Sequence, residues 1–193
     1  HSWVDGYMKS YKEAKLKDVR NETLESYIKK YNNDEQSFFS WYEDFDKTSD
    51  LRIKAGDFDH VYWVDALGIE WMSLIQHFVE ENPSKMRIEH AYIAATGLPT
   101  STQHNSKDCD TKISDLDEMV HGEYYQKYHT LAKQITLIGE IVDDLCRQKA
   151  DRRILIISDH GLTALSRLYQ PKKYEKKASH EGRYILLDKP CEV

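Results

Sequence analysis

The sequence predicts an α/β fold: a mostly parallel sheet with helices on both faces, preceded by an N-terminal helical segment. Short β-branched and aromatic runs at residues 60–64, 86–95 and 153–158 predict three strands. Helical periodicity lies between them, and strands that alternate with helices form parallel sheets. The length of 193 residues suits one domain with a helical annex. We expect helical residues 1–50 and an α/β domain over 51–193, and the abrupt start and finish predict a piece of a longer protein.

The elements follow from spacing along the chain. Up to about Phe45, aromatic and aliphatic residues recur every three or four positions, which predicts amphipathic helices. The stretches RNETLES and YNNDEQS supply helix start and stop signals there. Helical patterns also cover residues 69–79 and 124–147, and GRYILL at 182–187 predicts a late strand.

Composition excludes several classes of protein. Hydrophobic residues make up 40% and charged residues 31%, and no run is apolar enough to span a bilayer. The net charge of −6 argues against a broad electrostatic grip on nucleic acid. Three distant cysteines predict neither a disulfide framework nor a thiolate zinc site. With no signal peptide visible, we expect a soluble, cytoplasmic protein with reduced thiols.

Polar side chains follow each predicted strand. Asp65 follows the first, TGLPTSTQHN the second, and Asp159 and His160 the third. In open parallel sheets, ligands bind beyond the carboxyl ends of the strands. Carboxylate oxygens and imidazole nitrogens suit Zn²⁺ or Mn²⁺. The alternative is structural, because Asp65 and Asp159 could each cap a helix.

The second of these loops offers a nucleophile. Thr100, Ser101 and Thr102 follow a proline, where a helix could start and direct its N–H groups at an anion. A hydroxyl activated by a metal ion can attack phosphorus. Ser/Thr-rich loops also commonly just turn the chain.

Three motifs in this order, YWVDALGIEW, AATGLPTSTQ and ILIISDHGLTAL, resemble the PglZ domain. This domain is a branch of the alkaline phosphatase superfamily found in bacterial phage-exclusion (BREX) systems, and the sequence looks most similar to the type 4 variety. The resemblance covers residues 58–193. It implies an alkaline-phosphatase-like core, one metal held by Asp65, Asp159 and His160, and Thr102 as the nucleophile.

The second metal of the superfamily has less obvious counterparts. An Asp and a His four residues apart, Asp117 and His121, share a face if helical, and His180 is the candidate late ligand. Arg183, in the GRY stretch after it, could bind a phosphate bidentately. Chance spacing and an exposed loop histidine are the alternatives. The lysine- and tyrosine-rich residues 169–179 suit a solvated loop, or a surface for a nucleotide phosphodiester.

The predicted function is a metal-dependent phosphoesterase of phage defence, a phosphodiesterase or nuclease-like hydrolase rather than a monoesterase. The cofactor would be Zn²⁺, with Mn²⁺ or Mg²⁺ as alternatives, as one or two ions. The partners would be a phosphate ester or phosphodiester, from nucleotide or nucleic acid, and other phage-defence proteins in the bacterial cytoplasm, with no membrane. The alternative is a catalytically idle scaffold of the phage-defence complex. A phosphomutase-like enzyme would need further sugar-phosphate-binding loops.

Overall fold

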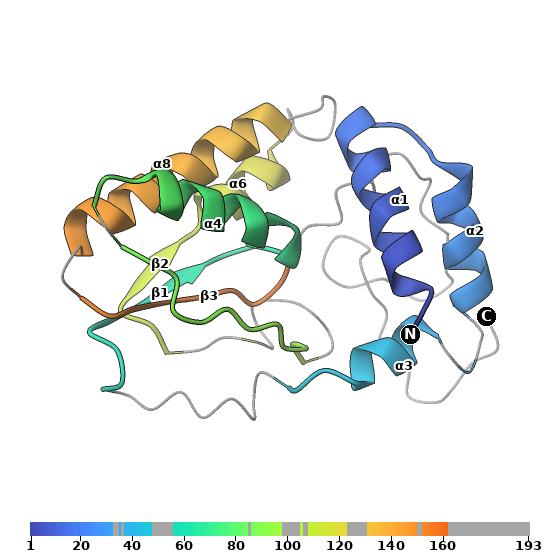
Figure 1. The fold of residues 1–193 in the computed structure, drawn as a ribbon, viewed down its shortest axis with the longest axis horizontal. Coiled ribbons are helices and arrows are strands. Elements are labelled where there is room, and N and C mark those ends of the chain that lie inside the picture. Colours follow the sequence, from blue (N-terminus) through green and yellow to red (C-terminus); the bar gives the residue numbers. More distant parts are fainter. Residues whose placement is uncertain are drawn as a thin grey trace.

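A three-stranded parallel sheet forms the centre of the structure, in the order β2-β1-β3 (Figure 1). The structure is a computed structural model and describes residues 1–32, 35, 37–47, 56–84, 86–97, 105, 108–122, 131–149 and 152–161. Strand β1 (His60–Val64) pairs with β2 (Thr111–Ile113) on one side and with β3 (Ile154–Ile157) on the other. All three strands run in one direction, so their carboxyl ends meet at one edge of the sheet. The α/β class and the strands at 60–64 and 153–158 are thereby confirmed.

Helices cover one face of this sheet. A 3₁₀ turn, η1 (Ile69–Trp71), leads into α4 (Met72–Glu81), and α6 (Asp115–His121) and α8 (Leu131–Lys149) complete the layer (Figure 1). The buried core between α4 and α8 is apolar and consists of Trp71, Ile138, Val142 and Cys146. This core confirms the helical stripe expected before the third strand.

Helices on both faces are not seen in the described part of the chain. Figure 1 shows α4, α6 and α8 on one side of the sheet, and the extended residues 86–97 run alongside β3. No helix among the described residues has the length and apolar character needed to cross a membrane.

The N-terminal helices pack through aromatic rings. They are α1 (Val4–Lys17), α2 (Glu22–Tyr31) and α3 (Phe38–Glu43), and they lie at one end of the structure (Figure 1). The Asn21 side chain caps α2 by accepting a hydrogen bond from the Leu24 N–H, and the Ser37 side chain caps α3 in the same way. Trp3 is 4% exposed and stacks on Tyr31 with ring centroids 4.4 Å apart. The expected amphipathic helices are confirmed.

The strand predicted over residues 86–95 is wrong. This segment is extended, and with the other described residues it forms one isolated bridge, between Lys47 and Ala95. Its large apolar side chains Ile88, Tyr92 and Ile93 are exposed, so β propensity here has no burial to support a ladder. The place beside β1 belongs to Thr111–Ile113, a strand that the sequence did not predict. The strand predicted at 182–187 lies outside the described residues, as do residues 124–130 of the predicted helix.

Candidate metal site

Asp65 stands at the end of β1 and is held there by the sheet. Its N–H donates to the Ile113 carbonyl oxygen at 2.9 Å, which continues the pairing with β2. The residue is only 3% exposed. The next residue, Ala66, is buried and takes a left-handed conformation (φ 63°), so the chain turns away directly after the carboxylate. A buried carboxylate needs a compensating cation or hydrogen-bond donor.

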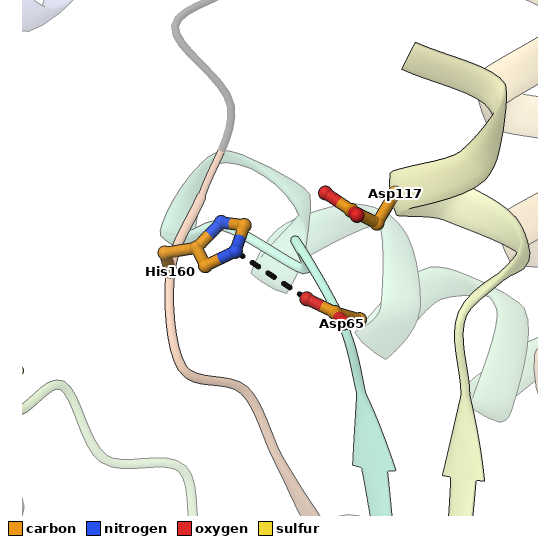
Figure 2. A group of neighbouring side chains, drawn as sticks. All are labelled: Asp65, Asp117 and His160. Atoms are coloured by element: carbon orange, nitrogen blue, oxygen red, sulfur yellow. Dashed lines mark ion pairs between the residues drawn. The ribbon is translucent and has the colours of Figure 1, made fainter. Parts of the chain in front are cut away.

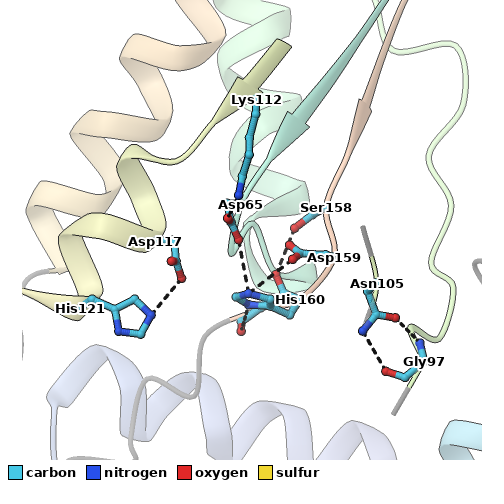
Figure 3. Close-up of polar contacts among 10 residues, drawn as sticks. Asp65, Gly97, Asn105, Lys112, Asp117, His121, Ser158, Asp159 and His160 are labelled. Atoms are coloured by element: carbon cyan, nitrogen blue, oxygen red, sulfur yellow. Dashed lines mark hydrogen bonds and ion pairs between the residues drawn. The ribbon is translucent and has the colours of Figure 1, made fainter. Parts of the chain in front are cut away.

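His160 follows β3 and points at Asp65. Its Nε2 lies 3.3 Å from Asp65 Oδ1 and 3.6 Å from Asp159 Oδ2 (Figure 3). Its Nδ1 lies 3.2 Å from the carbonyl oxygen of Gly161. That carbonyl can only accept, so this contact favours a proton on Nδ1 and leaves the Nε2 lone pair facing the carboxylates. Two carboxylates and a lone pair on one point require a proton or a cation between them.

Asp117 completes the group from α6. One ligand atom each from Asp65, Asp117 and His160 lies within 4.8 Å of the other two (Figure 2). Two atoms at about 2.1 Å from one ion lie no more than about 4.2 Å apart, so a small inward movement would suffice for ligation. His121 lies one turn further along α6, and its Nε2 is 3.4 Å from Asp117 Oδ1. It is not in this group. Asp117, expected at a second site, therefore lies at the first.

Asp159 is buried in the same place without a hydrogen bond to its carboxylate among the described residues. It is 3% exposed, and neither carboxylate oxygen has a hydrogen-bond partner among the described residues. The distance of 3.6 Å between Asp159 Oδ2 and His160 Nε2 is too long for a hydrogen bond. Asp159 was predicted as a direct ligand, but the structure groups Asp117, not Asp159, with Asp65 and His160. A buried carboxylate without a hydrogen-bond partner among the described residues, beside this group, fits a site that takes up a cation.

Lys112 is a member of the site that the sequence did not reveal. Its Nζ lies 2.7 Å from Asp65 Oδ2. The hydrogen bond to Asp65, together with the negative charges of Asp65, Asp159 and Asp117, raises the pKa of Lys112 above its ordinary value. No sequence pattern marks Lys112 as part of the site, because it lies within the short strand β2. Its pairing with Trp63 is what places it beside Asp65.

Two loops of the site cross at glycines. A Cβ added at Gly161 would lie 2.8 Å from the Gly68 Cα, closer than real Cβ contacts. Gly161 directly follows His160, and Gly68 lies in the turn after Asp65. Both residues must therefore lack side chains for the loops to approach in this way.

The loop with the predicted nucleophile is described only at its ends. The Gly97 N–H donates to Asn105 Oδ1 at 2.5 Å, and Asn105 Nδ2 donates to the Gly97 carbonyl oxygen at 3.0 Å (Figure 3). Asn105 is 8% exposed and closes the loop with both halves of its amide. The residues predicted as nucleophile, late ligand and phosphate ligand lie outside the described residues: Thr100, Ser101, Thr102, His180 and Arg183.

The donor set fits a divalent cation. Carboxylate oxygens and one imidazole suit Zn²⁺ or Mn²⁺, and carboxylates alone are common for Mg²⁺. The buried Asp159, whose oxygens have no hydrogen-bond partner among the described residues, strengthens the fit. No protein-family model, curated protein or solved structure matches this chain. The PglZ resemblance and the alkaline-phosphatase-like core therefore stay predictions.

Proposed function

We propose that the protein is a metal-dependent phosphoesterase, more specifically a phosphodiesterase or nuclease-like hydrolase. The convergence of Asp65, Asp117 and His160 at the carboxyl edge of a parallel sheet carries this proposal. The site lies where open α/β sheets bind their ligands. A role in bacterial phage defence follows from the PglZ resemblance alone.

Each described side chain has a role in this proposal. Asp65, Asp117 and His160 would hold the cation, and Asp159 would add negative charge beside it. A bound divalent cation supplies Lewis acidity, which stabilises charge on a phosphoryl oxygen. The Gly161 carbonyl holds the proton of His160 on Nδ1 and keeps Nε2 available as a ligand. The sheet fixes Asp65 through the Ile113 carbonyl oxygen.

The reacting oxygen in this proposal belongs to Thr102. It would attack phosphorus and displace one alcohol of the diester, which leaves a phosphothreonine diester. Water would then cleave the bond between phosphorus and Thr102 and release the phosphate monoester. Asn105 supports the placement of this loop, because its amide joins the loop's end to Gly97. Arg183 would bind the phosphate oxygens, and His180 would join a second set of ligands.

Hydrolysis of bis-p-nitrophenyl phosphate tests the proposal. We expect the Mn²⁺- or Zn²⁺-loaded protein to cleave this diester and the Thr102→Ala variant to lose the activity. Thr136→Ala is a matched control, because Thr136 lies on α8 and its exposed hydroxyl donates to the Ala132 carbonyl oxygen within the same helix. Cleavage by the loaded protein no faster than by Thr102→Ala would contradict the proposal.

A second candidate function is a catalytically idle scaffold for other phage-defence proteins. The ion pair of Lys112 with Asp65 favours it, because an ammonium group gives this carboxylate a counter-ion without any metal. Aromatic residues on the N-terminal helices, such as Phe39 at 61% exposure, could contact a partner. Metal analysis separates the two functions: a scaffold need not retain stoichiometric metal, and chelation would leave its partner binding intact.

A further inference from the structure

The carboxylate of Asp65 is shared between two different groups. Its Oδ2 accepts from the Lys112 ammonium at 2.7 Å, and its Oδ1 faces His160 Nε2 at 3.3 Å. Figure 3 shows Lys112 reaching Asp65 from the strand side, while His160 lies on the opposite side of the carboxylate. One oxygen of Asp65 is thus engaged by a positive charge that belongs to the protein.

A divalent cation at Asp65, Asp117 and His160 would lie close to this ammonium group. Like charges at short range repel strongly where water is largely excluded, and the Asp65 side chain is only 4% exposed. Cation binding therefore has to overcome the repulsion or displace the ammonium. Displacement is feasible, because the Lys112 side chain is 43% exposed and its long flexible stem can carry the charge into water.

The balance of charge shows what Lys112 does before a cation binds. Asp65, Asp117 and Asp159 bring three carboxylates to one sheet edge, and two of them are almost fully buried. Buried carboxylates without a counter-ion destabilise a fold. Lys112 offsets one of these charges, and it is the group whose removal would leave the site most negative.

We infer that Lys112 is an internal counter-ion that competes with the divalent cation for Asp65 and thereby weakens cation binding. This inference rests on the metal site of the proposed function. Without the ammonium group, Asp65 Oδ2 loses a competing positive charge, and the site gains negative charge. A neutral residue at position 112 therefore tightens cation binding, whereas a residue that keeps the charge does not.

Calorimetric titration of the whole chain with Mn²⁺ tests the inference. We expect Lys112→Met to lower the dissociation constant at least about tenfold, equivalent to about 1.4 kcal/mol. Lys112→Arg keeps the positive charge and should stay near the wild-type value. Lys47→Met is the matched control, because Lys47 pairs with Glu43 on the N-terminal helices at 3.0 Å, away from the carboxylates.

Unchanged or weaker Mn²⁺ binding by Lys112→Met would overturn the inference. If that variant does not fold, as judged by circular dichroism, Lys112→Gln replaces it, because Gln keeps a hydrogen-bond donor for Asp65 without the charge. Hydrolysis of bis-p-nitrophenyl phosphate in the same samples separates the two proposals. Tighter binding without hydrolysis overturns the phosphoesterase alone, Mn²⁺-dependent hydrolysis without tightening overturns the role of Lys112 alone, and no Mn²⁺ binding by any variant overturns both.

Discussion

The N-terminal helices and the carboxyl edge of the sheet bury opposite kinds of side chain. Around Trp3 the contacts are aromatic: Tyr31 stacks on it, and Phe38 meets it edge-on at 4.8 Å. At the sheet edge the buried groups are the carboxylates Asp65 and Asp159, each 3% exposed. Burial of aromatic rings stabilises a fold, whereas burial of carboxylates costs free energy unless a cation compensates them.

This difference separates the sources of stability from the source of function. The aromatic cluster leaves the buried Trp3 Nε1 without a hydrogen-bond partner among the described residues, but this indole is uncharged. The sheet edge keeps two buried oxygens of Asp159 without a hydrogen-bond partner in the described part of the chain. Natural folds tolerate such local cost mainly at functional sites, which is why we place the chemistry at the sheet and the structural support in the helices.

Removal of the Asp65 carboxylate should have the largest effect of all, and this effect should be on the hydrolytic activity. We expect Asp65→Ala to lower Mn²⁺-dependent hydrolysis of bis-p-nitrophenyl phosphate by about 100-fold or more, because a ligand that also orients the site is lost. Asp57→Ala changes an exposed carboxylate just before β1 and should leave the rate unchanged. Equal rates for the two variants would remove Asp65 from the chemistry.

Truncation of Trp3 should have the largest effect on stability. Trp3→Ala removes the ring at the centre of the aromatic cluster and should lower the free energy of unfolding by about 3–5 kcal/mol. Guanidinium unfolding curves measure this change. Phe39→Ala, which truncates a ring that is 61% exposed, is expected to cost less than about 0.5 kcal/mol. A small loss for Trp3→Ala would contradict the structural role of the cluster.

Lys15 of α1 pairs with Glu70 and so links the N-terminal helices to the part of the chain that follows β1. A buried and an exposed ion pair can therefore be compared within one helix. Its Nζ lies 3.2 Å from Glu70 Oε1 and 4.2 Å from the centre of the Trp71 ring, and both charged side chains are largely buried. Lys15→Ala should cost about 3 kcal/mol, because it leaves Glu70 buried and unpaired. Lys17→Ala breaks an exposed pair with Glu13 and should leave the stability nearly unchanged. If chemical unfolding gives equal losses of stability for the two variants, the buried pair of Lys15 contributes no more to stability than the exposed pair of Lys17.

Asn105 should have an intermediate effect. Asn105→Ala removes both hydrogen bonds to Gly97 and should lower the free energy of unfolding by about 2 kcal/mol. Asn32→Ala, at an exposed position after α2, is the control for a surface asparagine. If thermal unfolding of the two variants coincides, the Gly97 contact does not contribute to stability.

The smallest effect should appear at alkaline pH in the aromatic cluster. Burial raises the pKa of Tyr7 above its ordinary value of 10.0. The unfolded chain then ionises first, so this contribution to stability is complete below pH 10 and is lost as the pH rises through the folded pKa. Tyr7→Phe should make the unfolding free energy fall less steeply above pH 10. Identical slopes for both proteins would show that the phenol is not shielded.

The sequence predicted what depends on local pattern. Two strands with apolar runs, and helix α8 with its stripe, were recognisable because burial leaves a period in the sequence. Asp65 and His160 followed from the rule that parallel strands end at one edge. Residues 86–95 have strand-like composition, but Tyr92 at 74% exposure shows that composition without a buried face does not make a ladder.

The parts of the site that were missed depend on contacts between distant segments. Strand β2 has three residues and one of them is Lys112, so no hydrophobic alternation marks it. Its pairing with β1 brings Lys112 to Asp65 and also carries α6, with Asp117, to the same edge. The four-residue spacing of Asp117 and His121 predicted a shared helix face, but not which of the two reaches the site.

The crossing of the two ligand loops at Gly68 and Gly161 has an evolutionary consequence. Because the Gly68 Cα occupies the space that a Cβ at Gly161 would need, neither position can change alone without separating the turn after Asp65 from the loop of His160. A side chain gained at one crossing point would have to be accompanied by a shift of the other loop. Both positions should therefore remain glycine in any lineage that keeps the site.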